Sequence, residues 1–284
     1  MRRTRGSDWG TDRGIDWVRF VGLGVAAALF LMPFVYMLGF SLKPEDEIFS
    51  GSLSPLPGSL QGLANYPGAL IREPLLWYLV NGAIVCGGIL AFQLLFAVPC
   101  AFALAKLRFA GRELVFGLVL FALLIPIQAT ALPLYLGFAQ AGMLDSYGAL
   151  IAPFVSSAFA VFLFRQFFRT LPDDLLDSAR LDGCSEVSVI LRIVLPLTVP
   201  SATAFGIFSV VSHWNDLFWP LIVIRSPDLN TPPLGILAFR SADAGDRYGE
   251  LMAGTVVITA PLVIAFLVAQ RRFIEGISLG ALKG

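Results

Sequence analysis

Six long stretches of this chain contain no charged residue, and they constrain its fold more than any other feature. They are residues 20–42, 74–105, 114–144, 146–164, 193–215 and 251–270, and each is between 19 and 32 residues long. A helix that crosses a bilayer needs roughly 20 consecutive apolar residues. The composition agrees, since 57% of the residues are hydrophobic and only 14% are charged, against about 25% charged in a soluble domain. We therefore expect an all-α polytopic membrane protein with six transmembrane helices, of which the first is retained rather than cleaved as a signal peptide.

The basic residues indicate how the chain is oriented. Of its 20 Lys and Arg residues, 15 lie before the first stretch, after the last, or between stretches two and three and stretches four and five. Only five lie on the opposite side, whereas Asp and Glu divide evenly, ten and ten. Because Lys and Arg accumulate in cytoplasmic loops, both termini and the connection between stretches four and five are predicted to be cytoplasmic.

The sequence lacks the residues that several kinds of enzyme chemistry require. It has a single histidine, His213, and three cysteines in no metal-binding spacing, so we expect no metal site. It has no G-x-x-x-x-G-K-[ST] loop that would cradle the phosphates of ATP. We expect the chain to bind no cofactor and no nucleic acid, and to be no enzyme by itself.

The connection after the fourth stretch, PDDLLDSARLDGCSEVSVILRIVLPLTVP (172–200), is charged and predicted to be helical. Pro172 and the two acids after it suit the first turn of a helix, and Gly183 suits the end of one. Ser185 and Glu186 then begin a second helix that runs into the fifth stretch. The apolar residues of the first helix form one stripe: Leu175, Leu176, Ala179 and Leu181. Such a stripe needs something to pack against, although a solvated connection is the plainer alternative.

This segment resembles the cytoplasmic EAA loop of the permease subunits of bacterial ABC importers. That pattern runs Glu-Ala-Ala, three residues, Gly, about nine residues and Ile-x-Leu-Pro. Here Asp177-Ser178-Ala179, Gly183 and Ile193-Val194-Leu195-Pro196 stand at those positions, with Asp in place of Glu and Ser in place of the first Ala. Both replacements keep the acid and the short side chains.

Three further segments are similar to the MalG-type permeases of the carbohydrate-uptake branch. They are NGAIVCGGILAFQLLFAVPCAFALAKLRFAGR (81–112), HWNDLFWPLIVI (213–224) and the C-terminal QRRFIEGISLGALKG (270–284). On this basis residues 1–14 are expected to be a disordered cytoplasmic tail and 15–74 the first helix with an external loop. Residues 75–272 are then the type-1 ABC transmembrane domain, and 273–284 a cytoplasmic tail.

The resemblance implies a type I ABC importer fold in a bacterial cytoplasmic (inner) membrane. The expected partners are a second permease subunit, a dimer of ATP-binding ATPase subunits that use ATP and Mg²⁺, an extracytoplasmic solute-binding protein and the lipid membrane. The hairpin between helices four and five would be the coupling helix that docks into the ATPase. Its expected residues are Leu175, Asp177, Ser178, Ala179, Leu181, Asp182 and Gly183. The expected function is carbohydrate import, with a polyol or a glycerophosphodiester-type solute as the runner-up.

A second function class is an ATPase-independent secondary carrier, which would need coupling carboxylates at mid-span, and a non-transporting membrane scaffold is a third. The sequence offers no clear carboxylate of that kind. Asp216 is expected near the outer interface, because a helix that begins at Ile193 has crossed about 30 Å by residue 213, with Trp214 and Trp219 as interfacial belt residues. His213 is interpreted as a packed histidine rather than a proton relay. Gln93, Gln128 and Asn215 could line a sugar pathway, and helix–helix hydrogen bonding is an equal alternative for them.

Two prolines in the third stretch and two polar loops give further predictions. Pro126 and Pro133 should kink or break the third helix. The outer loops 43–73 and 225–250 are rich in polar and turn residues, and they would form the surface that meets a binding protein.

Overall fold

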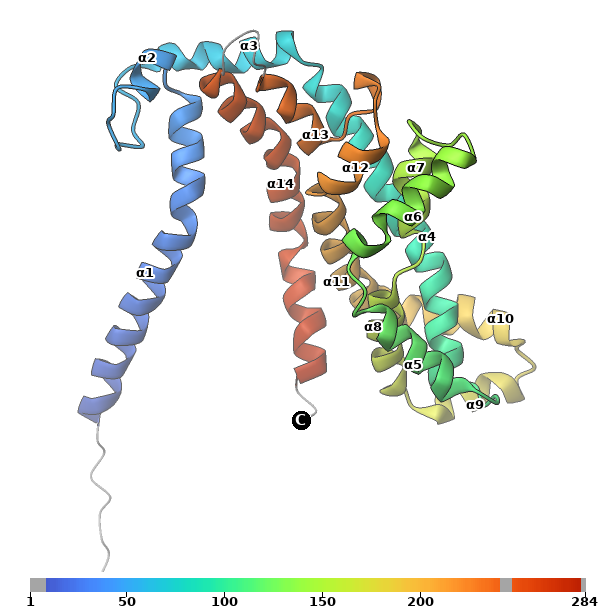
Figure 1. Cartoon of the computed structure of the whole chain (residues 1–284). Coiled ribbons are helices and arrows are strands. Elements are labelled where there is room, and N and C mark those ends of the chain that lie inside the picture. Colours follow the sequence, from blue (N-terminus) through green and yellow to red (C-terminus); the bar gives the residue numbers. More distant parts are fainter. Residues whose placement is uncertain (1–8, 241–246, 282–284) are drawn as a thin grey trace, which may run out of the picture. The chain divides into compact units, whose positions relative to one another are not determined.

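The computed structural model describes residues 9–240 and 247–281, and these are almost entirely helical. Four helices are long and apolar enough to cross a membrane. The spans within them are Arg19–Ser41, Leu75–Lys106, Glu186–Trp214 and Tyr248–Val268. Two bent helix pairs bring the total to six if each pair counts as one span. The prediction of six spans agrees with this pattern (Figure 1).

The first of two compact units contains residues 1–72 and 239–256. Its helices are α1 (Trp9–Ser41), α2 (Glu45–Ile48), the 3₁₀ turn η1 (Leu60–Ala64), α3 (Asn65–Arg72) and the first turns of α14 (Tyr248–Ala281). Since α1 begins at Trp9, residues 9–14 are helical and the expected disordered tail is wrong for them, while residues 1–8 lie outside the described part. Residues 273–281, expected as part of a cytoplasmic tail, continue α14.

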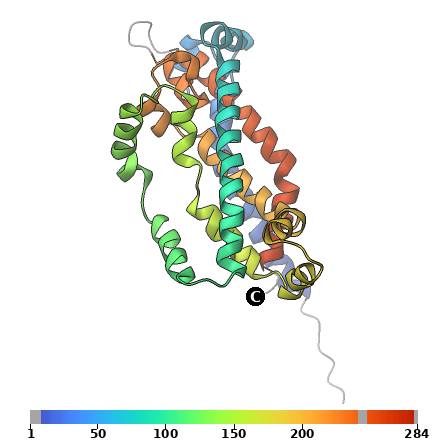
Figure 2. The ribbon, with the colours of Figure 1, turned by 90° about the vertical axis from the view of Figure 1, so that its right-hand side faces the viewer.

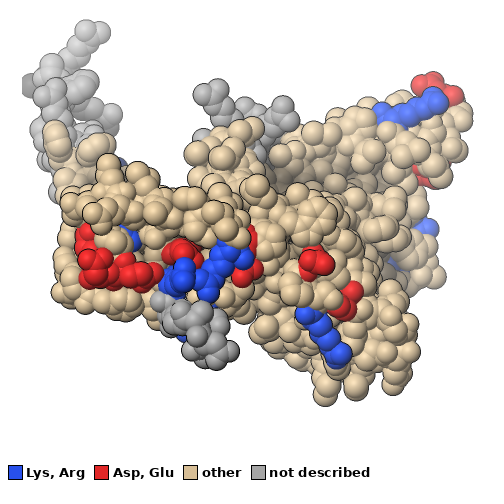
Figure 3. Space-filling view, turned by 90° about the horizontal axis from the view of Figure 1, so that it is seen from above, with Lys and Arg blue, Asp and Glu red and all other residues tan. Residues whose placement is uncertain are grey.

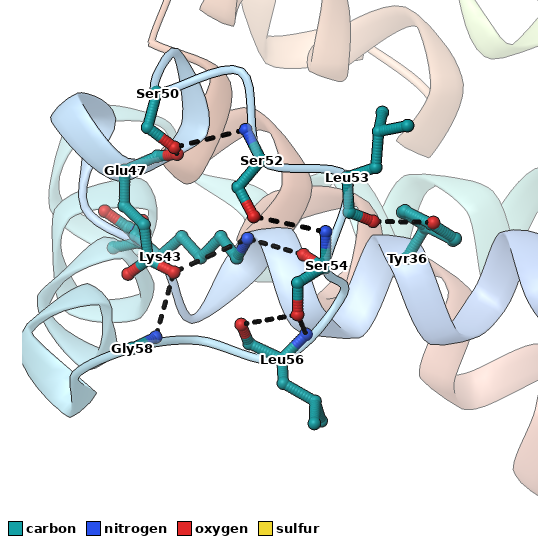
Figure 4. A network of polar contacts seen from close by, with 10 residues as sticks. Tyr36, Lys43, Glu47, Ser50, Ser52, Leu53, Ser54, Leu56 and Gly58 are labelled. Atoms are coloured by element: carbon teal, nitrogen blue, oxygen red, sulfur yellow. Dashed lines mark hydrogen bonds and ion pairs between the residues drawn. The ribbon is translucent and has the colours of Figure 1, made fainter.

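The loop after α1 is folded around a buried lysine, Lys43. Its ammonium donates to the carbonyl of Ser54 (2.6 Å) and lies 3.4 Å from the Glu47 carboxylate. Glu47 in turn accepts from the backbone N–H of Gly58 (2.9 Å), and the Tyr36 hydroxyl donates to the carbonyl of Leu53 (2.7 Å) (Figure 4). A loop that the sequence shows only as polar is therefore held by a network of bonds centred on one cation.

The second unit contains residues 73–238 and 257–284. Its long central helix is α4 (Leu75–Lys106), against which α8 (Ala158–Arg169) and α11 (Leu195–Trp214) pack. Its remaining elements are α5 (Arg112–Ala122), α6 (Ile127–Gln140), α7 (Tyr147–Ile151), η2 (Ala152–Phe154), α9 (Asp173–Leu181), α10 (Glu186–Val189), η3 (Ile190–Val194), α12 (Phe218–Val223), η4 (Pro227–Leu229), α13 (Pro232–Ile236) and η5 (Leu237–Phe239), whose last residue belongs to the first unit. In this unit α9 and α10 lie at the opposite end of α4 from α12 and α13 (Figure 1).

The third and fourth spans are broken. Helices α5 and α6 meet at 96° across the link before Pro126, and Figure 2 shows them as two separate segments. The break expected at Pro126 is confirmed, whereas Pro133 lies inside α6 without interrupting it. The fourth span bends by 42° between η2 and α8, where Ser157 caps α8 through its side chain. This second bend was not predicted.

Two apolar clusters hold the second unit together, one toward each end of α4. The first contains Ala101 and Phe102 of α4, Phe164 and Phe168 of α8, and residues of α9 to α11. The second gathers Val85 and Ile89 of α4 around Trp219. Above the second cluster, the fully buried Asn81 donates to the carbonyls of Asp228 and Asn230 and accepts from the Tyr147 hydroxyl. Figure 3, a view from above Figure 1, shows acidic and basic side chains next to one another on a surface that is mostly uncharged.

Candidate functional site

The candidate site is the helical hairpin formed by α9, the corner at Gly183 and α10. Helix α9 begins after Pro172, with Asp173 and Asp174 in its first turn. Lys106, the last residue of α4, donates to Asp173 Oδ1 (2.6 Å) and to the carbonyl of Leu171 (2.7 Å). The hydrogen bond from Lys106 and its positive charge lower the pKa of the Asp173 carboxyl. The start of α9 is thereby fixed to the end of a membrane span.

The corner at Gly183 is closed by backbone hydrogen bonds. The N–H of Gly183 donates to the carbonyl of Arg180 (3.0 Å), and that of Cys184 donates to the carbonyl of Ala179 (3.1 Å). This pair of bonds is the Schellman motif, which requires a left-handed residue, and Gly183 has φ = +84°. The expected helix-ending role of Gly183 is confirmed. Lack of space is not a reason for glycine here, because a Cβ at this position would meet no atom within 4 Å.

An arginine that sequence reasoning did not select joins the two arms of the hairpin. Arg180 donates from Nε to Glu186 Oε1 (2.8 Å) and from Nη1 to Asp177 Oδ1 (3.0 Å). These bonds, led by that to Glu186, raise the pKa of Arg180. Asp177, expected as a contact for another subunit, thus has a partner within its own helix, although its side chain is 62% exposed. The sequence signal for this role is the spacing of the acids, since Asp177 lies three residues before Arg180 and Glu186 lies six residues after it.

Burial divides the apolar stripe into two parts. Leu176 and Ala179 are 1% and 7% exposed and belong to the first apolar cluster, together with Phe168. The expectation that Ala179 faces another subunit is therefore wrong, because it packs inside its own chain. Leu175 is 40% exposed and Leu181 is 89% exposed, as expected for a contact surface.

The second arm adds exposed apolar residues to the same hairpin. Ser185 caps α10 by accepting from the N–H of Ser188 (3.3 Å), which confirms the predicted helix start. Val187 and Leu191 are 65% and 59% exposed. The segment then passes through the π-helical turn η3 directly before Pro196, which lacks the N–H that an α-helix would use there. The hairpin thus continues directly into the fifth span.

The remaining predicted residues of the hairpin lie on its exposed side. The Ser178 hydroxyl donates to the carbonyl of Leu175 (3.0 Å), which is a bond within one turn. Asp182 is the residue that closes α9, and its N–H donates to the carbonyl of Ser178 (3.0 Å). Both residues are exposed, so both are open to an external contact.

The three candidate pathway residues have different surroundings. Gln93 is 4% exposed, accepts from the Ser209 hydroxyl (2.6 Å) and donates to the carbonyl of Phe154 (3.0 Å). These bonds link helices, as in the alternative that the sequence left open. Gln128 is exposed in the first turn of α6, and Asn215 is exposed with its amide bonded to the carbonyl of Val211 (2.8 Å).

The residues around the end of α11 have structural partners. His213 lies with its ring 4.8 Å from that of Phe154 and its Nε2 3.4 Å from the Gln93 amide nitrogen, which fits a packed histidine. Asp216 follows the helix end and accepts from the N–H of Trp219 (3.3 Å). Trp214 and Trp219 are not belt residues, because they are 9% and 1% exposed inside the second unit.

The profile of the family described as "Binding-protein-dependent transport system inner membrane component" matches residues 93–278. The arabinooligosaccharides transport system permease protein AraQ of Halalkalibacterium halodurans is 34% identical over 273 residues, which cover 95% of this chain and 97% of that protein. The lactose transport system permease protein LacG of Rhizobium radiobacter is 30% identical and covers 94% and 96%. The sn-glycerol-3-phosphate permease UgpE of Escherichia coli is 32% identical and covers 90% and 92%.

A solved structure has the same fold. It is a chain in the crystal structure of a bacterial ABC transporter involved in the import of the acidic polysaccharide alginate. The match has a TM-score of 0.80 at 23% identity and covers 95% of this chain and all of the other.

Proposed function

Since this chain belongs to the family of binding-protein-dependent transport system inner membrane components, we propose that it forms half of the translocation pathway of an ATP-driven importer. The family consists of transport subunits, so the chain is a transport component and not an enzyme. The other half of the pathway would come from a second permease subunit. ATP would be bound and hydrolysed with Mg²⁺ by a partner ATPase dimer, and an extracytoplasmic binding protein would deliver the solute.

The proposed solute is a carbohydrate, either a sugar or an oligosaccharide. Support comes from relatives that are named as permeases for arabinooligosaccharides and lactose and that match nearly the whole chain. A phosphorylated glycerol or a related polyol is the second candidate, since UgpE is similar to this chain to about the same degree. An ATPase-independent carrier is the alternative class, and it would leave the exposed hairpin without a partner.

The observation that carries the coupling role is the exposed apolar surface of the hairpin. Leu181, Val187 and Leu191 are each more than half exposed on a segment that the positive-inside rule places in the cytoplasm. Burying one such side chain contributes roughly 1.5–3 kcal/mol, so a soluble partner that covers all three would gain substantially.

Movement of the hairpin would reach the membrane spans by two routes. Lys106 fixes the start of α9 to α4, and Leu176 packs in the cluster that contains Phe102 and Phe168. A partner that opens and closes while holding the exposed side of α9 would therefore displace the ends of α4 and α8. Gly183 and the Arg180–Glu186 contact would keep the two arms moving together.

Gly183→Val tests this role. Valine at φ = +84° is strained at a cost of roughly 1–2 kcal/mol, while open space around the site removes any steric clash. In the reconstituted complex we expect ATP hydrolysis stimulated by the binding protein, and uptake, to fall together, with membrane insertion unchanged. Asp177→Lys should lower both through a wrong charge at the contact.

The matched control is Gly51→Val. Gly51 has φ = +78° and equally open space, but it lies in the loop after α1. It should carry the same local strain and leave stimulated ATP hydrolysis intact. Full activity of the Gly183→Val complex would make the hairpin a simple connector.

Uptake of labelled arabinooligosaccharides, lactose and glycerol 3-phosphate by the reconstituted complex tests the solute class. We expect competition among sugars and none from glycerol 3-phosphate. Competition from glycerol 3-phosphate and none among the sugars would instead favour the second candidate, a phosphorylated glycerol or a related polyol.

A further inference from the structure

A basic cavity lies along α9, where α4 and α8 end and α5 begins. Its volume is about 550 Å³. Five cationic side chains line it, Lys106, Arg108, Arg112, Arg169 and Arg180, together with the two carboxylates Asp173 and Asp177. Five positive and two negative charges leave a formal charge of +3 on the lining.

The two carboxylates are already neutralised by partners, whereas two arginines are not. Asp173 bonds to Lys106 at 2.6 Å, and Asp177 bonds to Arg180 at 3.0 Å. Arg112 pairs with Glu113 at 2.9 Å. Arg108 and Arg169 are exposed, and within the part of the chain that the structure describes neither side chain makes a hydrogen bond or an ion pair. The cavity therefore presents two unpaired guanidinium groups.

The position of the cavity matches the level of lipid headgroups. Lys106 is the last residue of a span, Arg169 is the last residue of the bent pair that would form the fourth span, and Arg112 is the first residue of the pair that would form the third. Side chains at span ends lie at the boundary between hydrocarbon and water. An occupant of the cavity would thus sit beside the polar ends of the surrounding lipids.

A second cavity adjoins the first at the start of α5. It has a volume of about 420 Å³, shares Arg108 and Arg112, and adds Phe109, Glu113 and Leu114. From there a row of exposed apolar residues follows one face of α5: Leu114, Leu118 and Phe121, which are 71%, 59% and 61% exposed. Glu113 adds one negative charge, which lowers the combined formal charge of the two linings to +2. Its carboxylate lies near both Arg112 and Arg165.

We propose that these joined cavities bind the headgroup of an anionic phospholipid. The phosphodiester would lie between Arg108 and Arg169, because guanidinium groups bind phosphate through paired N–H donors. Its acyl chains would follow the exposed face of α5. An acidic side chain of a soluble partner would satisfy the arginines but would leave that apolar face uncovered. The site goes beyond the proposed transport function, and only its assignment to the inner leaflet rests on the proposed orientation.

The test uses the assembled transport complex purified from the membrane and reconstituted in phosphatidylcholine bilayers that contain spin-labelled lipid. The fraction of motionally restricted label is measured for phosphatidylglycerol and for phosphatidylcholine. Native protein should prefer phosphatidylglycerol, and Arg108→Gln combined with Arg169→Gln should reduce that preference roughly 30-fold, which is about 1 kcal/mol for each cation removed. Arg192→Gln, which removes another exposed charge of the same side outside the cavity, should leave the preference unchanged.

Three results for the variants would overturn the proposal. One is an unchanged preference in the double variant, and another is an equal loss in Arg192→Gln. The third is dissociation of the ATPase subunits from the double variant in detergent without added lipid, which would assign the cavity to a protein contact. Inorganic phosphate at millimolar concentration should not displace the labelled lipid, because it lacks the acyl chains; full displacement would also count against the lipid. Equal thermal unfolding temperatures of native and variant complexes establish that both are folded.

Discussion

At the scale of single residues, polar side chains within the spans are used to join helices. Gln93 occupies both its carbonyl oxygen and its amide group with Ser209 and Phe154. Gln93→Leu should therefore lower stability, by roughly 0.6–2 kcal/mol for the lost interhelical bonds, and should leave the KM for uptake unchanged. Thermal unfolding of the detergent-solubilised complex and uptake kinetics measure the two effects. A raised KM at unchanged stability would place Gln93 in the pathway instead.

Asp145 is a single residue on which the loop after α12 depends. It has φ = +55°, and one of its oxygens accepts from the backbone N–H groups of Arg225 and Ser226, both at 2.9 Å. These bonds and that from the Ser226 hydroxyl hold the pKa of the Asp145 carboxyl below its ordinary value. Asp145→Asn should cost about 2 kcal/mol, since a bond to a charged acceptor contributes roughly 1.5–3 kcal/mol.

The pH dependence of that cost has a defined sign. A lowered folded-state pKa stabilises the protein at pH values above the unfolded value near 3.9, and the stabilisation is lost as pH falls toward the folded value. The difference in unfolding temperature between the native and Asp145→Asn proteins should thus stay constant down to about pH 4 and shrink below it. A difference that grows on acidification would contradict the assigned role.

At the scale of elements, Arg165 connects three helix ends. It is 5% exposed, its guanidinium lies 3.6 Å from the centre of the Phe116 ring, and its Nε donates to the carbonyl of Leu104 (3.2 Å). Arg165→Met should destabilise the second unit by about 2–3 kcal/mol through the lost carbonyl partner and cation–π contact. Arg165→Lys should recover only part of this, because lysine lacks the planar group.

The control for Arg165 is Arg112→Met, since Arg112 is 33% exposed and pairs with the same Glu113. It should change stability by less than about 1 kcal/mol. Thermal unfolding of the three variants in one detergent provides the comparison, and equal losses in Arg165→Met and Arg112→Met would mean that burial of Arg165 is unimportant.

Elements that are set by local signals can be predicted from the sequence, whereas burial that depends on distant residues cannot. Charge-free length predicts the spans, and the Pro172, Gly183 and Ser185 signals predict the hairpin, because these depend on local geometry alone. The bend of the fourth span also has a local signal, Pro153, but the sequence-based prediction covered only Pro126 and Pro133. Burial of Trp219, Ala179 and Arg165 depends on residues far away in the chain, so pattern reasoning placed the first at a membrane interface, the second at a subunit contact and the third in a loop.

At the scale of the whole molecule, the orientation of the chain gives a testable pattern. Reporter fusions at Gly183 and at the two ends of the chain (Gly10 and Gly284) should read as cytoplasmic, and fusions at Gly58 and Ala244 as external. Gly284 and Ala244 lie outside the described residues, so the comparison of Gly183 with Gly58 is the most direct. A cytoplasmic reading at Gly58 would reverse the orientation.

The whole chain is also expected to be inactive by itself. Reconstituted alone in liposomes it should neither hydrolyse ATP nor move solute, because it has no phosphate-binding loop and forms half of the proposed pathway. Activity should appear when the second permease subunit, the ATPase and the binding protein are added. Uptake by the single chain would favour the carrier class.

The buried lysine of the loop after α1 has a practical consequence for surface chemistry. In the proposed orientation, Lys43 is the one primary amine of the chain on the external side. Its side chain is 1% exposed, and its Nζ is engaged by Ser54 and Glu47. An acylating reagent attacks a free, unprotonated amine, so a membrane-impermeant reagent added to intact cells should leave the folded protein unmodified. Glu47→Gln, which removes the ion pair and weakens the loop, should make the same lysine reactive.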